Sequence, residues 1–164
     1  MKRLIQPLIA VLITSFTSWS CAFSPAQESP LRNASARSGS ASCLSTLVNA
    51  TTDITQGRSI EMRLSFANIE GYPDSPLERP HQIILAMSGD DNEKVMELGG
   101  LQSSIANNLF RACDSAGMVT FAVANSGYVF SYGVMKDGSV KAFECIDTDL
   151  DNRKLLWGKQ ICNA

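Results

Sequence analysis

Apolar residues recur at helical spacing from Leu101 to Cys113, and this pattern predicts one amphipathic helix. Arg111 falls in its last turn, where a cation suits the negative end of the helix dipole. Gly117 follows shortly afterwards, so we expect it to end the helix in the left-handed conformation that glycine adopts readily.

Downstream of this helix the period changes from helical to alternating. Turn sequences Asn125-Ser126-Gly127 and Asp137-Gly138 tolerate the positive φ angles of tight hairpins. They separate three short runs that alternate between apolar and polar positions, namely 119–123, 128–133 and 140–145. We therefore expect a three-stranded meander whose apolar face is covered by the preceding helix.

The chain before the helix predicts further elements. A short helix is indicated by the apolar spacing of 43–48, and a strand by the alternation of 59–66. In this strand we expect Ile60, Met62, Leu64 and Phe66 to point inward and the intervening residues to meet water. A second strand is expected at 82–87, whereas 94–98 fits either a strand or a short helix.

Together these elements predict an α+β fold, in which an antiparallel sheet of about five strands carries one main helix, 101–113, on one face. Tyr128, Phe130 and Tyr132 share one face of their strand and are expected to be core. The opposite face, Val129, Ser131 and Gly133, is small and polar enough to meet solvent.

The N-terminus predicts export. A basic head, Met1-Lys2-Arg3, precedes an apolar run that is too short to span a bilayer and is followed by small residues. We assign 1–22 as a cleaved signal peptide, 23–42 as a flexible Ser/Ala/Pro-rich linker and 43–164 as one globular domain. The expected location is secreted or periplasmic, with membrane contact only through the signal peptide before its cleavage.

The cysteine count agrees with an oxidising compartment. Apart from Cys21, four cysteines remain, which is an even set: Cys43, Cys113, Cys145 and Cys162. We prefer the pairs Cys145–Cys162, which closes a short loop, and Cys43–Cys113, which ties the start of the domain to its helix. A zinc site built from the same four residues is disfavoured, because no C-x-x-C pair is present.

The charge balance bears on the choice of partner. Without Lys2 and Arg3, 12 basic residues stand against 16 acidic ones. Nucleic acids and anionic lipids select clustered Lys and Arg, so neither is the expected partner.

An acidic segment indicates a candidate metal site. Asp147, Asp149 and Asp151 carry carboxylates at every second position, as the start of a calcium loop does. The twelfth position, where an EF-hand needs a bidentate glutamate, is Gly158. Weak calcium binding and a solvated acidic turn both remain open here, and no other cofactor is expected.

Catalytic patterns are sparse. His81 is the only histidine, and no G-x-S-x-G, H-E-x-x-H or phosphate-loop motif accompanies it. A small secreted hydrolase with a site around His81 is therefore the alternative, and the sequence leans away from an enzyme.

The leading hypothesis is an exported binding module that acts on a protein or cell-envelope ligand. Its preferred contact element is the proline-rich loop 71–79, where Tyr72 and Leu77 are apolar residues in a connector. His81 borders this loop and completes the expected binding residues. A weak calcium-binding structural domain is the third hypothesis.

Overall fold

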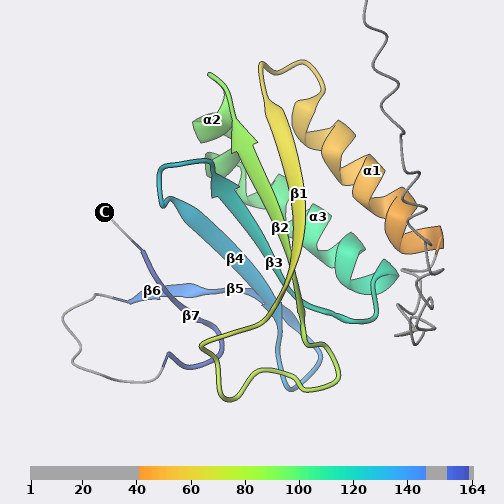
Figure 1. Cartoon of the computed structure of the whole chain (residues 1–164), viewed down its shortest axis with the longest axis vertical. Helices are drawn as coiled ribbons and strands as arrows, with labels where there is room; N and C mark the ends of the chain where they lie inside the picture. Colours follow the sequence, from red (N-terminus) through yellow and green to blue (C-terminus); the bar gives the residue numbers. More distant parts are fainter. Residues whose placement is uncertain (1–40, 147–154, 163–164) are drawn as a thin grey trace, which may run out of the picture. The chain divides into compact units, whose positions relative to one another are not determined.

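The computed structural model describes residues 41–146 and 155–162, and a five-stranded sheet runs through them (Figure 1). The strands lie in the order β1-β2-β3-β4-β5. Their bounds are β1 (Glu61–Asn68), β2 (His81–Ser88), β3 (Ala116–Val123), β4 (Val129–Val134) and β5 (Val140–Ala142). All described residues belong to one compact unit, Ser35–Ala164.

The α+β class is confirmed, but the sheet is mixed rather than antiparallel throughout. Strands β2 and β3 are parallel, and the other three pairs are antiparallel. Between β2 and β3 the chain passes through α2 (Asn92–Glu97) and α3 (Gly99–Ala112). A helical crossover returns the chain to the end of the sheet from which it came, so the next strand runs in the same direction.

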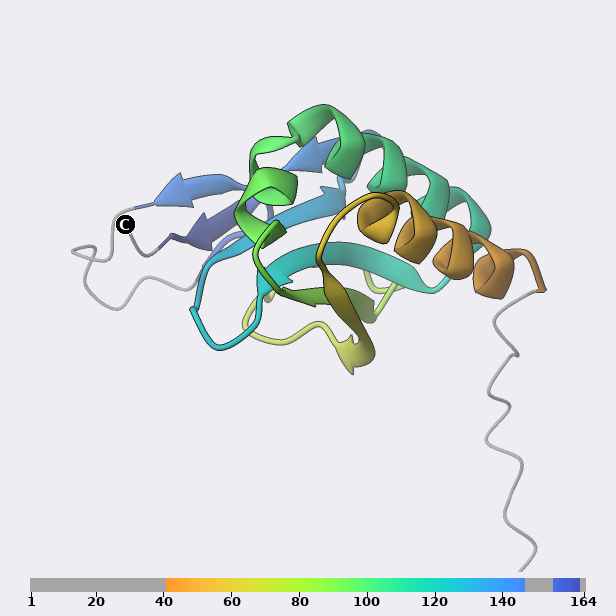
Figure 2. The same ribbon diagram turned by 90° about the horizontal axis from the view of Figure 1, so that it is seen from above.

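The helices lie on one face of the sheet (Figure 2). The expected helix at 101–113 is α3, and the segment whose state the sequence left open is the helix α2. The expected short helix is longer than its pattern indicated: α1 spans Ala41–Thr55 and begins inside the segment assigned to the linker. Its buried residues recur at helical spacing: Cys43, Leu47, Ala50 and Ile54.

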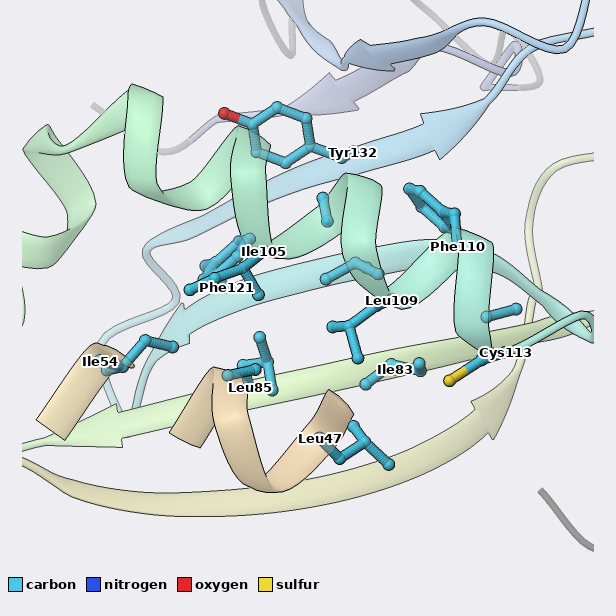
Figure 3. Packing of buried hydrophobic residues seen from close by; sticks show 14 of the residues in the cluster. Leu47, Ile54, Ile83, Leu85, Ile105, Leu109, Phe110, Cys113, Phe121 and Tyr132 are labelled. Atoms are coloured by element: carbon cyan, nitrogen blue, oxygen red, sulfur yellow. The ribbon is translucent and has the colours of Figure 1, made fainter. Parts of the chain in front are cut away.

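The core lies between these helices and the central strands (Figure 3). Leu85 of β2 and Phe121 of β3 stand opposite each other and are fully buried. They meet Ile54 from α1 and Leu109 from α3, which are also fully buried. The Cys43–Cys113 disulfide joins the start of α1 to the residue after α3, as the sequence predicted.

Gly117 does not end a helix. The α3 helix stops at Ala112, and the N–H of Cys113 donates to the carbonyl of Leu109. Gly117 lies in β3 instead, where a Cβ atom would come within 2.3 Å of the carbonyl oxygen of Arg79. Glycine is needed here because the loop before β2 packs directly on the strand, not because φ is positive.

The C-terminal segment covers part of the opposite face. Strands β6 (Glu144–Ile146) and β7 (Lys159–Ile161) form a parallel pair, closed by the predicted Cys145–Cys162 disulfide. A Cβ atom on Gly133 would lie 2.4 Å from Phe143 and 2.9 Å from Trp157. Ser131 is 5% exposed, and its N–H donates to Oε1 of Gln160. The expectation that this face of β4 meets solvent is therefore wrong, because the tail packs on it.

Candidate functional site: the outer edge of strand β1

The expected contact loop is anchored at one end and open at the other. Tyr72 is half-buried, and its hydroxyl donates to the carbonyl of Lys159 at 2.9 Å. Its ring meets Phe143 and Trp157 edge-on, at centroid distances of 5.6 and 5.4 Å, and burial raises its pKa. Leu77, by contrast, is 90% exposed. Tyr72 thus holds the loop to the C-terminal segment, and Leu77 presents a large apolar side chain to solvent.

His81 is the first residue of β2 and stands opposite Asn68 of β1. Its backbone N–H donates to the carbonyl of Ser115 at 3.0 Å. Within residues 41–146 and 155–162, its imidazole takes part in no hydrogen bond or ion pair. A catalytic histidine needs an orienting acceptor and a nucleophile within hydrogen-bond reach, so the geometry offers no support for the hydrolase alternative.

The expected calcium ligands Asp147, Asp149 and Asp151 lie outside the described residues. Among the described residues, no group of three or more histidine, cysteine or acidic side chains is placed to hold a metal ion.

Strand β1 exposes two large apolar side chains that the alternation placed inward. Leu64 is 41% exposed and Phe66 is 60% exposed. They stand opposite Leu85 and Ile83, which are buried, so all four point to the helix-covered face. Only the start of the alternation behaves as expected, because Ile60 and Met62 are partly buried against the core.

Leu64 and Phe66 are exposed because the layer of helices is narrower than the sheet that it covers. Five strands span about 24 Å at about 4.8 Å per strand. Two helices packed side by side cover about 20 Å at most, because their axes lie about 8–10 Å apart. The helix layer therefore stops short of the sheet's edge, and β1 is the strand left partly uncovered (Figure 2).

The backbone of β1 is open along the same edge. The N–H of Ile69 donates to the carbonyl of Pro80, which makes 69 and 80 a hydrogen-bonded pair of the antiparallel ladder. Such pairs alternate with non-hydrogen-bonded ones. The odd residues of β1 thus bond to β2, and its even residues point their N–H and C=O groups outward. Within the described chain, these outward groups meet no strand beyond β1.

The neighbouring flank of α1 carries two exposed apolar side chains. Leu44 and Val48 are 64% and 58% exposed. At 100° per residue they lie on the side of α1 away from Asn49 and Asp53, which line a cavity of about 400 Å³ shared with α3. In Figure 3, β1 runs on the side of α1 that is opposite α3. We call Leu44, Val48, Leu64 and Phe66 the apolar β1 edge.

Exposed edge strands usually carry lysine, proline or a bulge that discourages pairing with another chain. The eight residues of β1 contain neither lysine nor proline, and their register with β2 is uninterrupted. Their two charged side chains, Glu61 and Arg63, lie on the face away from the helices. The absence of lysine and proline is the signal in the sequence that could have indicated the site. It becomes informative only once β1 is known to be an edge strand.

No protein-family model, curated protein or solved structure matches this chain. In the part of the chain that the structure describes, no helix is both long and apolar enough to cross a membrane. The candidate site therefore rests on geometry alone.

Proposed function

We propose that this protein is an exported binding module that takes up an extended segment of a partner protein by strand addition at the apolar β1 edge. The observation that carries the proposal is that the same residues of β1 have both an exposed apolar side chain and backbone groups left unpaired within the described chain. Leu64 and Phe66 expose large apolar side chains, and their backbone groups point out of the sheet. Exposed sheet edges of this kind bind peptides through main-chain hydrogen bonds and side-chain contacts at alternate positions.

The geometry defines the chemistry of the bound segment. A strand placed beside β1 sends every second side chain to the helix-covered face, where Leu44, Val48 and Phe66 offer apolar contact. The intervening side chains fall on the face that carries Glu61 and Arg63. The module therefore selects an extended segment that alternates between apolar and polar residues.

Export is supported by the sulfur chemistry. Both disulfides have the pairing preferred from the sequence, and such bonds persist in oxidising compartments. The N-terminal pattern of a basic head and a short apolar run agrees with this location.

The test uses a synthetic peptide of alternating valine and threonine with a lysine at each end. Nuclear magnetic resonance of the labelled full chain would follow its amide signals during titration to millimolar peptide. We expect the largest shifts at Met62, Leu64, Phe66 and Asn68, whose N–H groups point outward, and weaker binding to the variant Phe66→Lys.

The matched control is the same peptide with N-methyl groups on the amides that would face β1. It keeps every side chain but lacks the donors, so it is expected to leave the β1 amides unshifted. Equal binding of both peptides, shifts confined to other elements, or no shift in β1 at millimolar peptide would each disprove strand addition.

A further inference from the structure

We propose that the segment taken up at the apolar β1 edge is β1 of a second copy of this chain, paired antiparallel about a twofold axis at Ser65. This inference rests on the proposed function, because it names the occupant of the same edge. The resulting dimer would carry one continuous ten-stranded sheet, five strands from each copy.

Strand β1 has the chemistry that the edge selects. It alternates between apolar Met62, Leu64 and Phe66 and a second set that begins with Glu61 and Arg63. Antiparallel pairing places residues of the same face opposite each other. A second β1 would therefore lay its own apolar row on the apolar row of the first, and its polar row on the polar one.

The register of the two β1 strands follows from the charges that would stand opposite each other and from the number of residues that would pair. A pairing centred on Arg63 would place this residue opposite itself, and like charges directly opposite each other destabilise a sheet. A pairing centred on Leu64 leaves the two arginines diagonal to each other. One centred on Met62 places Glu61 opposite Arg63 of the second copy, but it pairs only three of the eight residues of β1. Centred on Ser65, the pairing places Leu64 opposite Phe66 of the second copy, and Arg63 opposite its Ala67.

This register also satisfies the backbone. Leu64 and Phe66 both point their N–H and C=O groups outward, so they form a hydrogen-bonded pair across the axis. Ser65 uses its backbone groups on β2 and faces its counterpart as a non-hydrogen-bonded pair. In such a pair the Cα atoms lie about 4.5 Å apart.

The helices permit the approach. A twofold axis perpendicular to the sheet keeps both helix layers on the same face, so the α1 flanks with Leu44 and Val48 face each other across the joint. Asp53 is the single charged residue of α1, and it lies on the other flank, towards α3. Two flanks that carry no charged residue therefore meet, and the exposed Leu44 and Val48 of one copy are covered by those of the other.

The first test compares oligomeric state among full-length variants by sedimentation velocity. The parent chain is expected to show a species of twice the monomer mass at micromolar concentration. Phe66→Lys should raise the dimer dissociation constant at least about tenfold, because a lysine on an edge strand opposes pairing. Leu77→Lys also introduces a lysine in place of an apolar side chain, but in the loop after β1, at a position that is 90% exposed and outside the strand, so it should leave the dimer intact.

The second test fixes the register. A Ser65→Cys variant, oxidised under dilute conditions, should form a disulfide-linked dimer, because the two thiols would meet at the axis. Ala67→Cys is the matched control: Ala67 would face Arg63 of the second copy, so this variant should stay unlinked. Equal linking of both variants would refute the register centred on Ser65.

The outcomes separate this inference from the proposed function. A parent chain that stays monomeric up to its solubility limit, while the alternating peptide still shifts the β1 amides, refutes the second copy and leaves strand addition standing. A monomeric parent chain whose β1 amide signals also stay unshifted by the peptide refutes both the second copy and strand addition. A dimer that survives Phe66→Lys refutes the inference, because its interface would then lie elsewhere.

Discussion

Leu64 and Leu85 stand opposite each other in the β1–β2 ladder and point to the same face of the sheet, yet Leu85 is fully buried and Leu64 is 41% exposed. The boundary of the hydrophobic core therefore runs between two neighbouring strands. Residues on its inner side hold the fold, and residues on its outer side are free to serve another purpose.

This boundary predicts a contrast between two matched substitutions. Leu85→Ala should lower the free energy of unfolding by about 2–5 kcal/mol, because it leaves a cavity in the core. Leu64→Ala should cost less than about 1 kcal/mol in the monomer, since its side chain is partly solvated already. Urea denaturation of the two variants would measure both values. Similar losses would mean that β1 is covered in solution to the same extent as β2.

The alternating pattern located β1 and β2 correctly and grouped the residues that share a face. It could not indicate that Leu64 and Phe66 are exposed, because exposure depends on how many strands the helix layer covers. That number follows from the order of strands in the sheet, which depends on contacts distant in sequence. The same dependence on distant contacts explains why the sequence does not indicate the apolar β1 edge.

Whether a local sequence pattern predicts its structure correctly depends on whether residues distant in the sequence pack against it. The disulfide pairs followed from spacing and element positions alone, and both are confirmed. Gly117 looked like a helix terminator, because the sequence does not reveal that Arg79 packs against it. Ser131 and Gly133 looked solvent-facing, because the tail that covers them arrives from the far end of the chain.

Gly117 offers a second test of the packing. Gly117→Ala would place a Cβ atom 2.3 Å from the carbonyl oxygen of Arg79, so the backbone must shift. The shift would disturb Nη1 of Arg79, which donates to the carbonyls of Phe110 and Ala116. We expect a loss of about 1–3 kcal/mol in stability, measured by denaturant unfolding.

The control for this substitution is Gly100→Ala, because Gly100 lies in α3 and a Cβ atom added to it would meet no other atom within 4 Å. Alanine is the better helix former, so this variant should be as stable as the parent or up to about 1 kcal/mol more stable. Destabilisation of both variants alike would show that the close approach at Gly117 is not what matters.

The two disulfides should differ in their access to reductant. Cys43 and Cys113 are 6% and 5% exposed, whereas Cys145 is exposed and Cys162 is half-buried. Brief treatment of the native protein with dithiothreitol, followed by alkylation and peptide mass spectrometry, should label Cys145 and Cys162 first. Labelling of Cys43 and Cys113 at the same rate would contradict the burial of the α1–α3 bridge.

The start of β1 is tied to the turn before α2 by a carboxylate, and this tie predicts a dependence of stability on pH. Asp91 accepts hydrogen bonds from Lys94 and from the backbone N–H of Ser59, the latter at 2.8 Å. The hydrogen bond from Lys94, followed by that from Ser59, holds the pKa of Asp91 below its usual value.

A carboxyl group whose pKa is lower in the folded state stabilises the fold above its unfolded pKa, and this contribution is lost as pH falls through the folded pKa. Asp91→Asn should therefore reduce the stability of the protein at neutral pH and should have little effect once the acid range is reached. Urea midpoints of the two proteins, measured from neutral pH down through the carboxyl range, should converge. Curves that stay parallel over that whole range would show that the carboxylate contributes nothing to the tie between Ser59 and α2.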